Sequence, residues 1–208
     1  MAGVFIVVEG IDGAGKGFVM MKLQEHITER SKKYDHVLLT REPTHEKHGA
    51  KLRELLKKHD DPYSSNHEFL DLFTSDRRDH LRHHIEPCLA KGYVVLCDRF
   101  KYSTIAFQQA QGIPLAEVIK SQEGFKAADL TILLDLPANT ALERVANRAE
   151  GTEKFEKLDF QEKVRQNYLM LSRMFPNEKI AVIDASTDKE NVWTQVKTAL
   201  EESKVLPY

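Results

Sequence analysis

Five short segments rich in valine, isoleucine and leucine recur along this chain of 208 residues, and they constrain its fold more than any other feature. They are continuous apolar runs without polar alternation, at Val4 to Val8, His36 to Thr40, Tyr93 to Cys97, Leu130 to Leu134 and Ile180 to Ile183. An alternating strand has one face in water, whereas a continuous apolar run indicates a strand covered on both faces. The five runs therefore predict a buried parallel sheet of five strands.

Longer stretches with apolar residues at helical spacing separate these runs. The expected helices are Gly17 to Arg30, Lys47 to Lys58, Asn66 to Ala90, Ala138 to Arg148, Phe160 to Met174 and Lys189 to Ser203. Pro87 is expected to break the third helix, because proline has no N–H for a helical hydrogen bond. Alternating strands and helices predict a three-layer α/β fold with helices on both faces of the sheet. We find no linker or repeat, so residues 1–208 are expected to form one domain.

The charge balance limits the partners of the chain. Thirty Lys and Arg residues face 32 Asp and Glu residues, for a net charge of -2. This balance argues against binding to nucleic acid or to an anionic membrane through a broad basic surface. The apolar run at the N-terminus is far shorter than a membrane span of about 20 residues. With only two cysteines, Cys88 and Cys97, the chain is expected to be cytoplasmic.

The first apolar run leads into a glycine-rich loop in which Gly10, Gly15 and Lys16 match the phosphate-binding pattern G-x-x-x-x-G-K. Backbone N–H groups of such a loop surround phosphate oxygens, and the helix that follows presents its positive end. Lys16 adds a positive charge for the β- and γ-phosphates. We therefore expect the phosphates of a nucleotide to be bound by Gly10, Ile11, Asp12, Gly13, Ala14, Gly15, Lys16, Gly17 and Phe18.

The last position of this pattern departs from the rule. A Ser or Thr hydroxyl normally contacts Mg²⁺ there, and Gly17 has no side chain to do so. Two interpretations remain open. Either water replaces the hydroxyl and a carboxylate elsewhere helps to hold Mg²⁺, or the chain binds nucleotide and turns it over poorly.

Charged residues follow the second and third predicted strands. Arg41 follows the second, and Asp98 and Arg99 follow the third. Ligands of such folds bind beyond the carboxyl ends of the strands, so these side chains are candidates for a site. Asp98 is expected to organise Mg²⁺, and an arginine can bind a phosphate with two hydrogen bonds.

The third predicted helix carries two further groups of interest. Phe73 and Arg77 lie four residues apart and so share one face, where they could stack on a base and bond to its edge. His80, His83 and His84 have a spacing that could hold a transition metal. Because nothing in the sequence specifies the remaining ligands, we favour a solvated helix face for these histidines.

In combination, these motifs resemble those of the thymidylate kinase family, a group of P-loop nucleoside monophosphate kinases. The resemblance covers the glycine-rich loop, Arg41-Glu42-Pro43, Leu72 to Arg77, Asp98-Arg99-Phe100 with Ser103-Thr104 and Ala106-Phe107-Gln108, and Phe160 to Arg165 with Tyr168. It implies the P-loop kinase fold with a short lid near residues 149–159, and a homodimer. It also implies Mg²⁺-dependent transfer of the γ-phosphoryl group of ATP to dTMP, which gives dTDP.

The resemblance also implies a role for each matching residue. Lys16, Asp12, Arg99 and the lid residue Lys154 would serve catalysis; the lid lysine matters because neither the glycine-rich loop nor the lid contains an arginine. Arg148 would lie along the adenine of ATP. The acceptor would be bound by Asp12, Arg41, Phe73, Arg77, Arg99, Thr104, Phe107 and Gln161. Two alternatives remain: a kinase for another nucleoside or nucleotide, and a nucleotide-binding protein whose catalysis is weak or lost because of Gly17.

Overall fold

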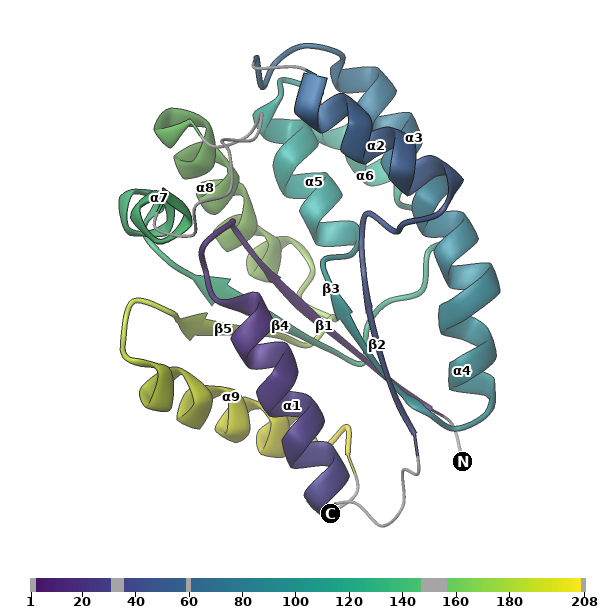
Figure 1. Ribbon diagram of the computed structural model, residues 1–208, viewed down its shortest axis with the longest axis vertical. Coiled ribbons are helices and arrows are strands. Elements are labelled where there is room, and N and C mark those ends of the chain that lie inside the picture. The colour runs from purple at the N-terminus through teal and green to yellow at the C-terminus, as the bar shows by residue number, and fades with distance from the viewer. Residues whose placement is uncertain (1–2, 31–35, 59–60, 147–156, 207–208) are drawn as a thin grey trace.

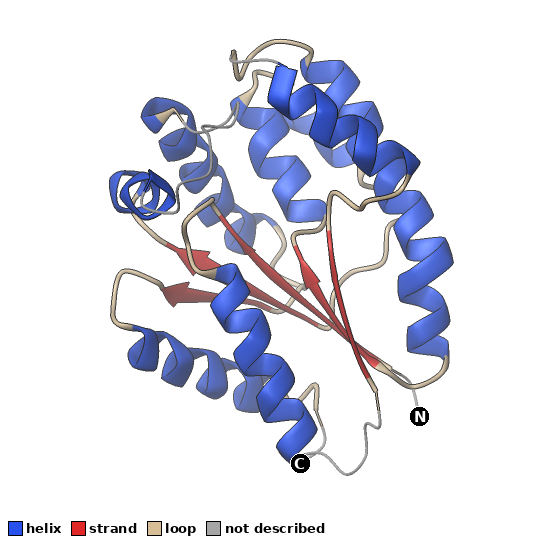
Figure 2. Cartoon of the chain, viewed as in Figure 1, coloured by secondary structure: helices blue, strands red, loops and turns tan. Residues whose placement is uncertain are grey.

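The computed structural model of the chain describes residues 3–30, 36–58, 61–146 and 157–206. Its five strands form one sheet in the order β2-β3-β1-β4-β5, and all of the paired strands are parallel (Figures 1 and 2). Their bounds are β1 Val4–Gly10, β2 Val37–Arg41, β3 Val94–Asp98, β4 Leu130–Asp135 and β5 Ile180–Asp184. Every predicted strand is confirmed, and each runs one or two residues further at its carboxyl end than predicted.

Helices cover both faces of this sheet, which confirms the predicted three-layer α/β fold. One face carries α1 (Lys16–Arg30) and α9 (Lys189–Ser203), which lie side by side in Figure 1. The other helices are α2 Lys47–Lys58, α3 Asn66–His80, α4 Glu86–Ala90, α5 Lys101–Ala110, α6 Leu115–Ser121, α7 Ala138–Ala146 and α8 Leu158–Met174. The predicted end of α7 at Arg148 lies outside the described residues.

Strand β1 lies at the centre of the sheet, and all of its residues are buried. Val4, Ile6 and Val8 belong to one core cluster with the apolar residues of α1 and α9. Phe5 and Val7 point to the opposite face, where they pack with residues of α4 and the turn before it. Successive side chains of a strand point to opposite faces, so a strand between two helical layers must be apolar on both.

The predicted break at Pro87 is misplaced, because the chain continues in helical form through this proline. Between α3 and α4 the chain winds more widely in the π-helix η1 (Leu81–Ile85), and the Glu86 N–H bonds to the Leu81 carbonyl. Pro87 lies in the first turn of α4. Its missing N–H is tolerated there, and the wider turn separates its ring from the preceding carbonyls.

Helices α5 and α6 were not predicted, for different reasons. Nine of the ten residues of α5 are buried, so its sequence lacks the alternation of apolar and polar faces that marks a surface helix. Helix α6 has seven residues, too few to establish a period. The failure to predict α5 matters for function, because α5 carries Thr104 and Phe107.

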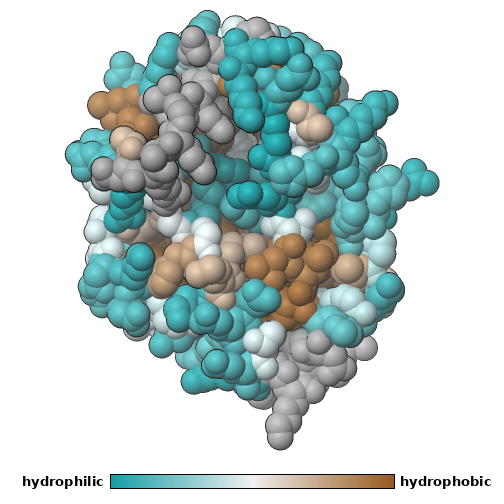
Figure 3. Space-filling model, in the orientation of Figure 1, coloured by the Kyte–Doolittle hydropathy of each residue, from teal (hydrophilic) through white to brown (hydrophobic). Residues whose placement is uncertain are grey.

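The surface in Figure 3 is mainly hydrophilic over α2 and α3, with apolar side chains between α1 and β2. Exposed apolar residues of these two elements include Met21 and Leu39. In the part of the chain that the structure describes, no helix is long and apolar enough to cross a membrane.

Helix α2 begins close against the loop that follows β2. Gly49 allows this approach, since a Cβ atom there would lie 2.2 Å from the Thr44 carbonyl oxygen. Arg53, one turn further along α2, donates a 2.5 Å hydrogen bond to the Pro43 carbonyl. The start of α2 thus holds the loop that carries the Arg41-Glu42-Pro43 motif.

We expect Gly49→Ala to destabilise the protein by about 2 kcal/mol, because the clash with the Thr44 backbone outweighs the usual helix-stabilising effect of alanine. The matched control is Gly17→Ala, another helical glycine, whose added Cβ would meet nothing within 4 Å. Urea unfolding of both variants measures the difference. Equal stability of the two variants would contradict the proposed close contact.

Candidate active site

The carboxyl ends of the three strands β2, β3 and β1 bring the predicted site residues to one edge of the sheet. Asp98 of β3 is in register with Val8 of β1 on one side and with Arg41 of β2 on the other. The glycine-rich loop follows β1 directly and leads into α1. The loop, Arg41, Asp98 and Arg99 therefore meet, as the parallel sheet predicts.

The glycine-rich loop is closed around the side chain of Lys16. The Lys16 ammonium donates hydrogen bonds to the carbonyls of Gly10 (3.2 Å) and Ile11 (3.1 Å). Burial and the nearby Arg99 lower the pKa of Lys16, which Asp12 at 3.8 Å partly opposes. A phosphate group bound in the loop would favour the charged form of this lysine.

Gly13 shows why the loop needs glycine. Its φ of +84° lies in the left-handed region, and a Cβ atom would lie 2.2 Å from the Ala141 carbonyl oxygen. The backbone of the loop thus packs directly on helix α7. Phe18, by contrast, packs its side chain against the main core, so only its backbone is available to a phosphate.

The buried carboxylate of Glu9 connects the end of β1 to two helices. It accepts hydrogen bonds from the Phe100 N–H (2.9 Å), from the Ser103 N–H (3.1 Å) and hydroxyl (2.6 Å), and from the Tyr168 hydroxyl (3.0 Å). Burial raises the pKa of Glu9 above its ordinary value, against the opposing effects of Ser103 and Arg99. Glu9 thereby aligns α5 and α8 with the glycine-rich loop.

Arg99 lies at the centre of the site. Its guanidinium donates to Asp12 Oδ1 (2.7 Å), the Ser103 hydroxyl (3.1 Å) and the Tyr168 hydroxyl (3.2 Å), and it lies 5.1 Å from the centre of the Phe107 ring. Burial opposes its charge, but the surrounding oxygens outweigh burial and raise the pKa of Arg99. Arg99 also has a φ of +70°, a strained conformation that is concentrated at functional sites.

An open cavity of about 470 Å³ lies between the start of α1, the carboxyl ends of β2 and β3, and the loop after β2. Arg41 and Asp98 form an ion pair of 3.5 Å at its wall. The cavity is lined by Gly17, Met20, Leu39, Thr40, Arg41, Thr44, His45, Glu46, His80, His84 and Asp98. A phosphorylated ligand can enter here between the start of α1 and the loop after β2.

The residues at this cavity fit a magnesium ion. Asp98 Oδ1 is buried and has no hydrogen-bond partner among the described residues. The Gly17 position faces open space on the same cavity, with room for a water molecule where a hydroxyl would lie. Magnesium is usually held by one or two carboxylates, waters and substrate phosphates, and this set provides the carboxylate.

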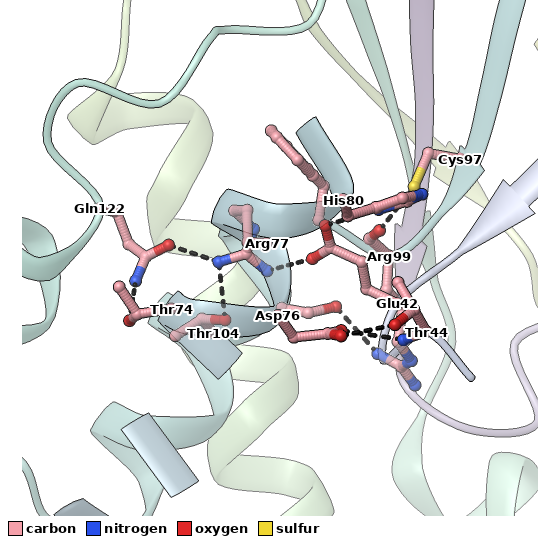
Figure 4. Close-up of polar contacts among 12 residues, drawn as sticks. Glu42, Thr44, Thr74, Asp76, Arg77, His80, Cys97, Arg99, Thr104 and Gln122 are labelled. Carbon is pink, nitrogen blue, oxygen red and sulfur yellow. Dashed lines mark hydrogen bonds and ion pairs between the residues drawn. The ribbon is translucent and has the colours of Figure 1, made fainter. Parts of the chain in front are cut away.

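Arg77 is fully buried in a cluster of polar side chains, whose contacts Figure 4 shows. Its guanidinium donates to Glu42 Oε2 (2.5 Å), to the Thr104 hydroxyl (3.0 Å) and to the Gln122 side-chain oxygen. It also lies 4.9 Å from the centre of the Phe100 ring. Arg77 and Thr104, predicted separately from α3 and α5, are thus brought together.

The structure places the remaining predicted residues in different surroundings. Phe73 is half-buried and packs beside Phe69, with ring centres 6.3 Å apart. Phe107 is buried between Phe160 and Tyr168, and Gln161 is buried in α8. Arg148, Lys154 and most of the expected lid at 149–159 lie outside the described residues.

The interpretation of the histidines as a solvated helix face is wrong for His80. This side chain is 1% exposed and bonds to Glu42 and Thr40, while His83 and His84 are exposed. Within the described ranges, no group of three or more His, Cys, Asp or Glu side chains could hold a metal ion.

Several residues of the site were not identified as candidates from the sequence: Glu9, Glu42, Ser103, Gln122 and Tyr168. A carboxylate at the end of an otherwise apolar run, as at Glu9, is the one local signal, since a buried acid requires partners. Gln122 has no such signal, because its proximity to Arg77 depends on how α6 packs.

The sheet is parallel, and a loop with the phosphate-binding pattern follows its first strand. Arginines and an aspartate lie at the ends of the neighbouring strands. This combination defines a P-loop phosphotransferase. Comparison with known proteins narrows this class. Residues 8–196 match the family model described as thymidylate kinase. A probable thymidylate kinase of Pyrococcus abyssi is 39% identical over 205 residues, covering 96% of this chain and 98% of the relative.

Two bacterial relatives agree. A thymidylate kinase of Brachyspira hyodysenteriae is 34% identical over the whole chain and 98% of the relative, and one of Desulfovibrio desulfuricans is 39% identical over 95% of each. The chain belongs to the thymidylate kinase family and is a nucleoside monophosphate kinase.

The raised pKa of Glu9 predicts a pH dependence of stability. Because the unfolded carboxyl ionises at its ordinary pKa of 4.5 and the buried one at a higher pH, the contribution of Glu9 to stability is lost as pH rises above 4.5. We expect Glu9→Gln to gain stability relative to the wild type by up to about 1.4 kcal/mol per pH unit across this window. Urea unfolding of both proteins between pH 4.5 and 7 measures it.

The exposed variant Glu202→Gln controls for removal of a negative charge and should show no such trend. A difference between Glu9→Gln and wild type that moves in the opposite direction with pH would show that hydrogen bonding, and not burial, dominates at Glu9.

Proposed function

We propose that the enzyme transfers the γ-phosphoryl group of ATP to dTMP and forms dTDP. The observation that supports this most directly is the juxtaposition of two sites of different character. The glycine-rich loop with Lys16 supplies backbone N–H groups and a positive charge for phosphates. The buried cluster around Arg77, with Phe73 on the same helix, supplies hydrogen-bonding groups and an aromatic ring for a base. Arg99 lies between these two regions, in contact with Phe107.

In this proposal the donor phosphates lie in the loop from Gly10 to Phe18, and Lys16 contacts their β- and γ-oxygens. Lys16 exchanges its hydrogen bonds to the Gly10 and Ile11 carbonyls for bonds to phosphate, which is a stronger partner because it carries charge. Arg148 lies along the adenine. Lys154, in the lid at 149–159, supplies positive charge to the transferred group, as a point charge without the planar fork of arginine.

The acceptor phosphate is bound by Arg41 and Arg99, which are held in position by Asp98 and Asp12. Asp12 also reaches the acceptor sugar and the metal region. Thr104, Phe107 and Gln161 line the sugar and base pocket, Phe73 stacks on thymine, and Arg77 donates to its carbonyl edge. The bulk of Phe107 acts against a ribose 2′-hydroxyl.

This chemistry requires no general base, because the attacking oxygen of dTMP is already an anion. It requires alignment of the two nucleotides and positive charge around the transferred group. Asp98 is the carboxylate proposed to hold Mg²⁺, and the chemistry that the ion supplies, when bound, is neutralisation of charge on the phosphate oxygens. Arg99, fixed by Asp12, Ser103 and Tyr168, needs no reorganisation as charge develops.

We further propose that the protein is a homodimer, that it is cytoplasmic, and that residues 1–208 form a single catalytic domain with its lid at 149–159. The support for each is the family to which the chain belongs, whose model extends over residues 8–196. The absence of a spanning helix in the described residues is compatible with this location.

An acceptor panel tests the reaction. With ATP and Mg²⁺, we expect ADP release to be fastest with dTMP among dTMP, dUMP, dCMP, dGMP and the free nucleosides. Lys16→Ala should lower kcat by about 10² to 10³-fold, because the positive charge at the phosphates is lost. Preference for another acceptor would support a different kinase. Tight binding of ATP and dTMP by calorimetry without turnover would support a binding protein that has lost catalysis.

Gly17 provides a second test. If water replaces the missing hydroxyl, Gly17→Ser should lower the Mg²⁺ concentration for half-maximal activity by about fivefold, the equivalent of roughly 1 kcal/mol. Gly17→Ala is the matched control, because it changes the helix but adds no ligand. Identical Mg²⁺ titrations for the serine and alanine variants would mean that the metal does not use this position.

A further inference from the structure

His80 forms the least expected contact of the structure. It lies at the end of α3 with 1% of its surface exposed, and both of its ring nitrogens have partners. Nδ1 lies 3.1 Å from Glu42 Oε1, and Nε2 lies 2.7 Å from the Thr40 hydroxyl. Figure 4 shows His80 and Arg77 on the same helix, both directed at Glu42. The imidazole therefore connects Thr40, near the end of β2, to Glu42, which follows the strand.

Glu42 is shared between this histidine and Arg77. Its second oxygen, Oε2, accepts the 2.5 Å bond from Arg77 Nη2, and the whole pair is shielded from water, with side-chain exposures of 1% and 3%. In a buried pair each charge depends on its partner, because water cannot replace it. The direction of the Arg77 guanidinium thus depends on where the Glu42 carboxylate points.

One contact to Arg77 is not enough to fix that carboxylate. The terminal torsion of glutamate has a broad energy profile, so a carboxylate held by one oxygen can rotate about its last bond. A second bond on Oε1, made by His80, removes this freedom. Without it, Oε1 would also remain buried without that hydrogen bond, which is unfavourable.

The other partners of Arg77 are neutral. Thr104 and Gln122 accept from Nη1, and the rings of Phe100 and Phe125 lie within 6 Å of the guanidinium, at 4.9 and 5.9 Å. Among the described residues, the anionic partner of Arg77 is therefore Glu42. Any loss of order at Glu42 passes directly to the arginine.

We propose that His80 is a positioning residue for recognition of the acceptor base. By joining Thr40 to Glu42, it holds the Glu42 carboxylate in the one orientation that directs Arg77 toward the base pocket. This inference rests on the proposed function, in which Arg77 donates to thymine, and it assigns to His80 an effect on the acceptor but none on ATP.

Other contacts of α3, with the loop after β2 and with the start of α2, allow this effect to be separated from general anchoring of the loop. Asp76 accepts from the Thr44 N–H (2.8 Å), and Asp79 contacts His48 (3.0 Å). The His48 pair resembles the His80 pair in chemistry, since in both a histidine binds a carboxylate, but it joins the start of α2 to α3. The His48 pair is partly exposed, and its carboxylate is Asp79, whereas the ion-pair partner of Arg77 is Glu42, which makes it a suitable control.

Two amide variants test the proposal with almost the same chemistry. In His80→Asn the side-chain N–H can occupy the place of Nδ1 and keep the bond to Glu42. In His80→Gln the longer chain places its amide near Nε2, where it keeps Thr40 and loses Glu42. For His80→Asn, His80→Gln and His48→Asn, the kinetic measurements are kcat, the KM of dTMP at saturating ATP and the KM of ATP at saturating dTMP. Calorimetry gives the Kd of dTMP, and thermal unfolding gives the midpoint temperature of each variant.

We expect His80→Gln to raise the KM and Kd of dTMP about tenfold, while the KM of ATP stays within about twofold of the wild type. His80→Asn should recover most of the loss, and His48→Asn should resemble the wild type. Glu42→Gln, which keeps the shape of the carboxylate, should reproduce the effect of His80→Gln if either histidine variant fails to fold.

Three results would overturn the proposal: equal dTMP affinity of the asparagine and glutamine variants, parallel changes in the KM of dTMP and of ATP, or an equal effect of His48→Asn. A wild-type enzyme that shows no preference for dTMP would instead overturn the proposed function. The wild-type acceptor panel and the variant comparison therefore distinguish the two failures.

Discussion

The carboxylate of Glu9 accepts hydrogen bonds from the Phe100 N–H, from the N–H and hydroxyl of Ser103, and from the hydroxyl of Tyr168. These donors belong to the segment after β3, to α5 and to α8, while Glu9 itself is the residue before the glycine-rich loop. A buried carboxylate with fewer partners would be strongly unfavourable, so the four bonds have to form together. They set the distance between the glycine-rich loop and the helices α5 and α8.

Each cation of the site that lies in the described residues is paired with a carboxylate. Lys16 and Arg99 share Asp12, Arg41 pairs with Asp98, and Arg77 pairs with Glu42. The pairing keeps long side chains in defined positions. It also limits the repulsion between neighbouring cations: burial and then Arg99 lower the pKa of Lys16, and Asp12 opposes both. It also reconciles a net charge of -2 with a site for highly charged nucleotides, because the positive groups are concentrated at one edge of the sheet.

The two ends of the proposed acceptor site are built in different ways. Arg41 lies at the open cavity in an ion pair that is largely exposed on the arginine side, so solvent screens it and a phosphate can compete for it. Arg77 and Glu42 are almost completely buried, so that pair is retained and its geometry is shaped by the residues behind it. His80 belongs to this second group through its contact with Glu42, and the role in base recognition proposed for it acts through that carboxylate and not through contact with a nucleotide.

Local sequence was sufficient for the parts of the protein that follow local rules. The apolar runs predicted all five strands, because a strand covered on both faces has no alternation to hide it, and the loop from Gly10 to Lys16 was recognisable because its backbone conformation demands glycine at fixed spacing. The sequence predicted a helical break at Pro87, but the helical form continues through this proline. The irregularity is the π-helix η1 before it, whose Leu81 and Ile85 pack against the sheet. Glu9 and His80 make their buried contacts with residues that are 38 or more positions away in the chain. The role of a buried polar side chain depends on the groups that the folded chain places around it. Those groups are far apart in the sequence, so no local spacing predicts that they will meet.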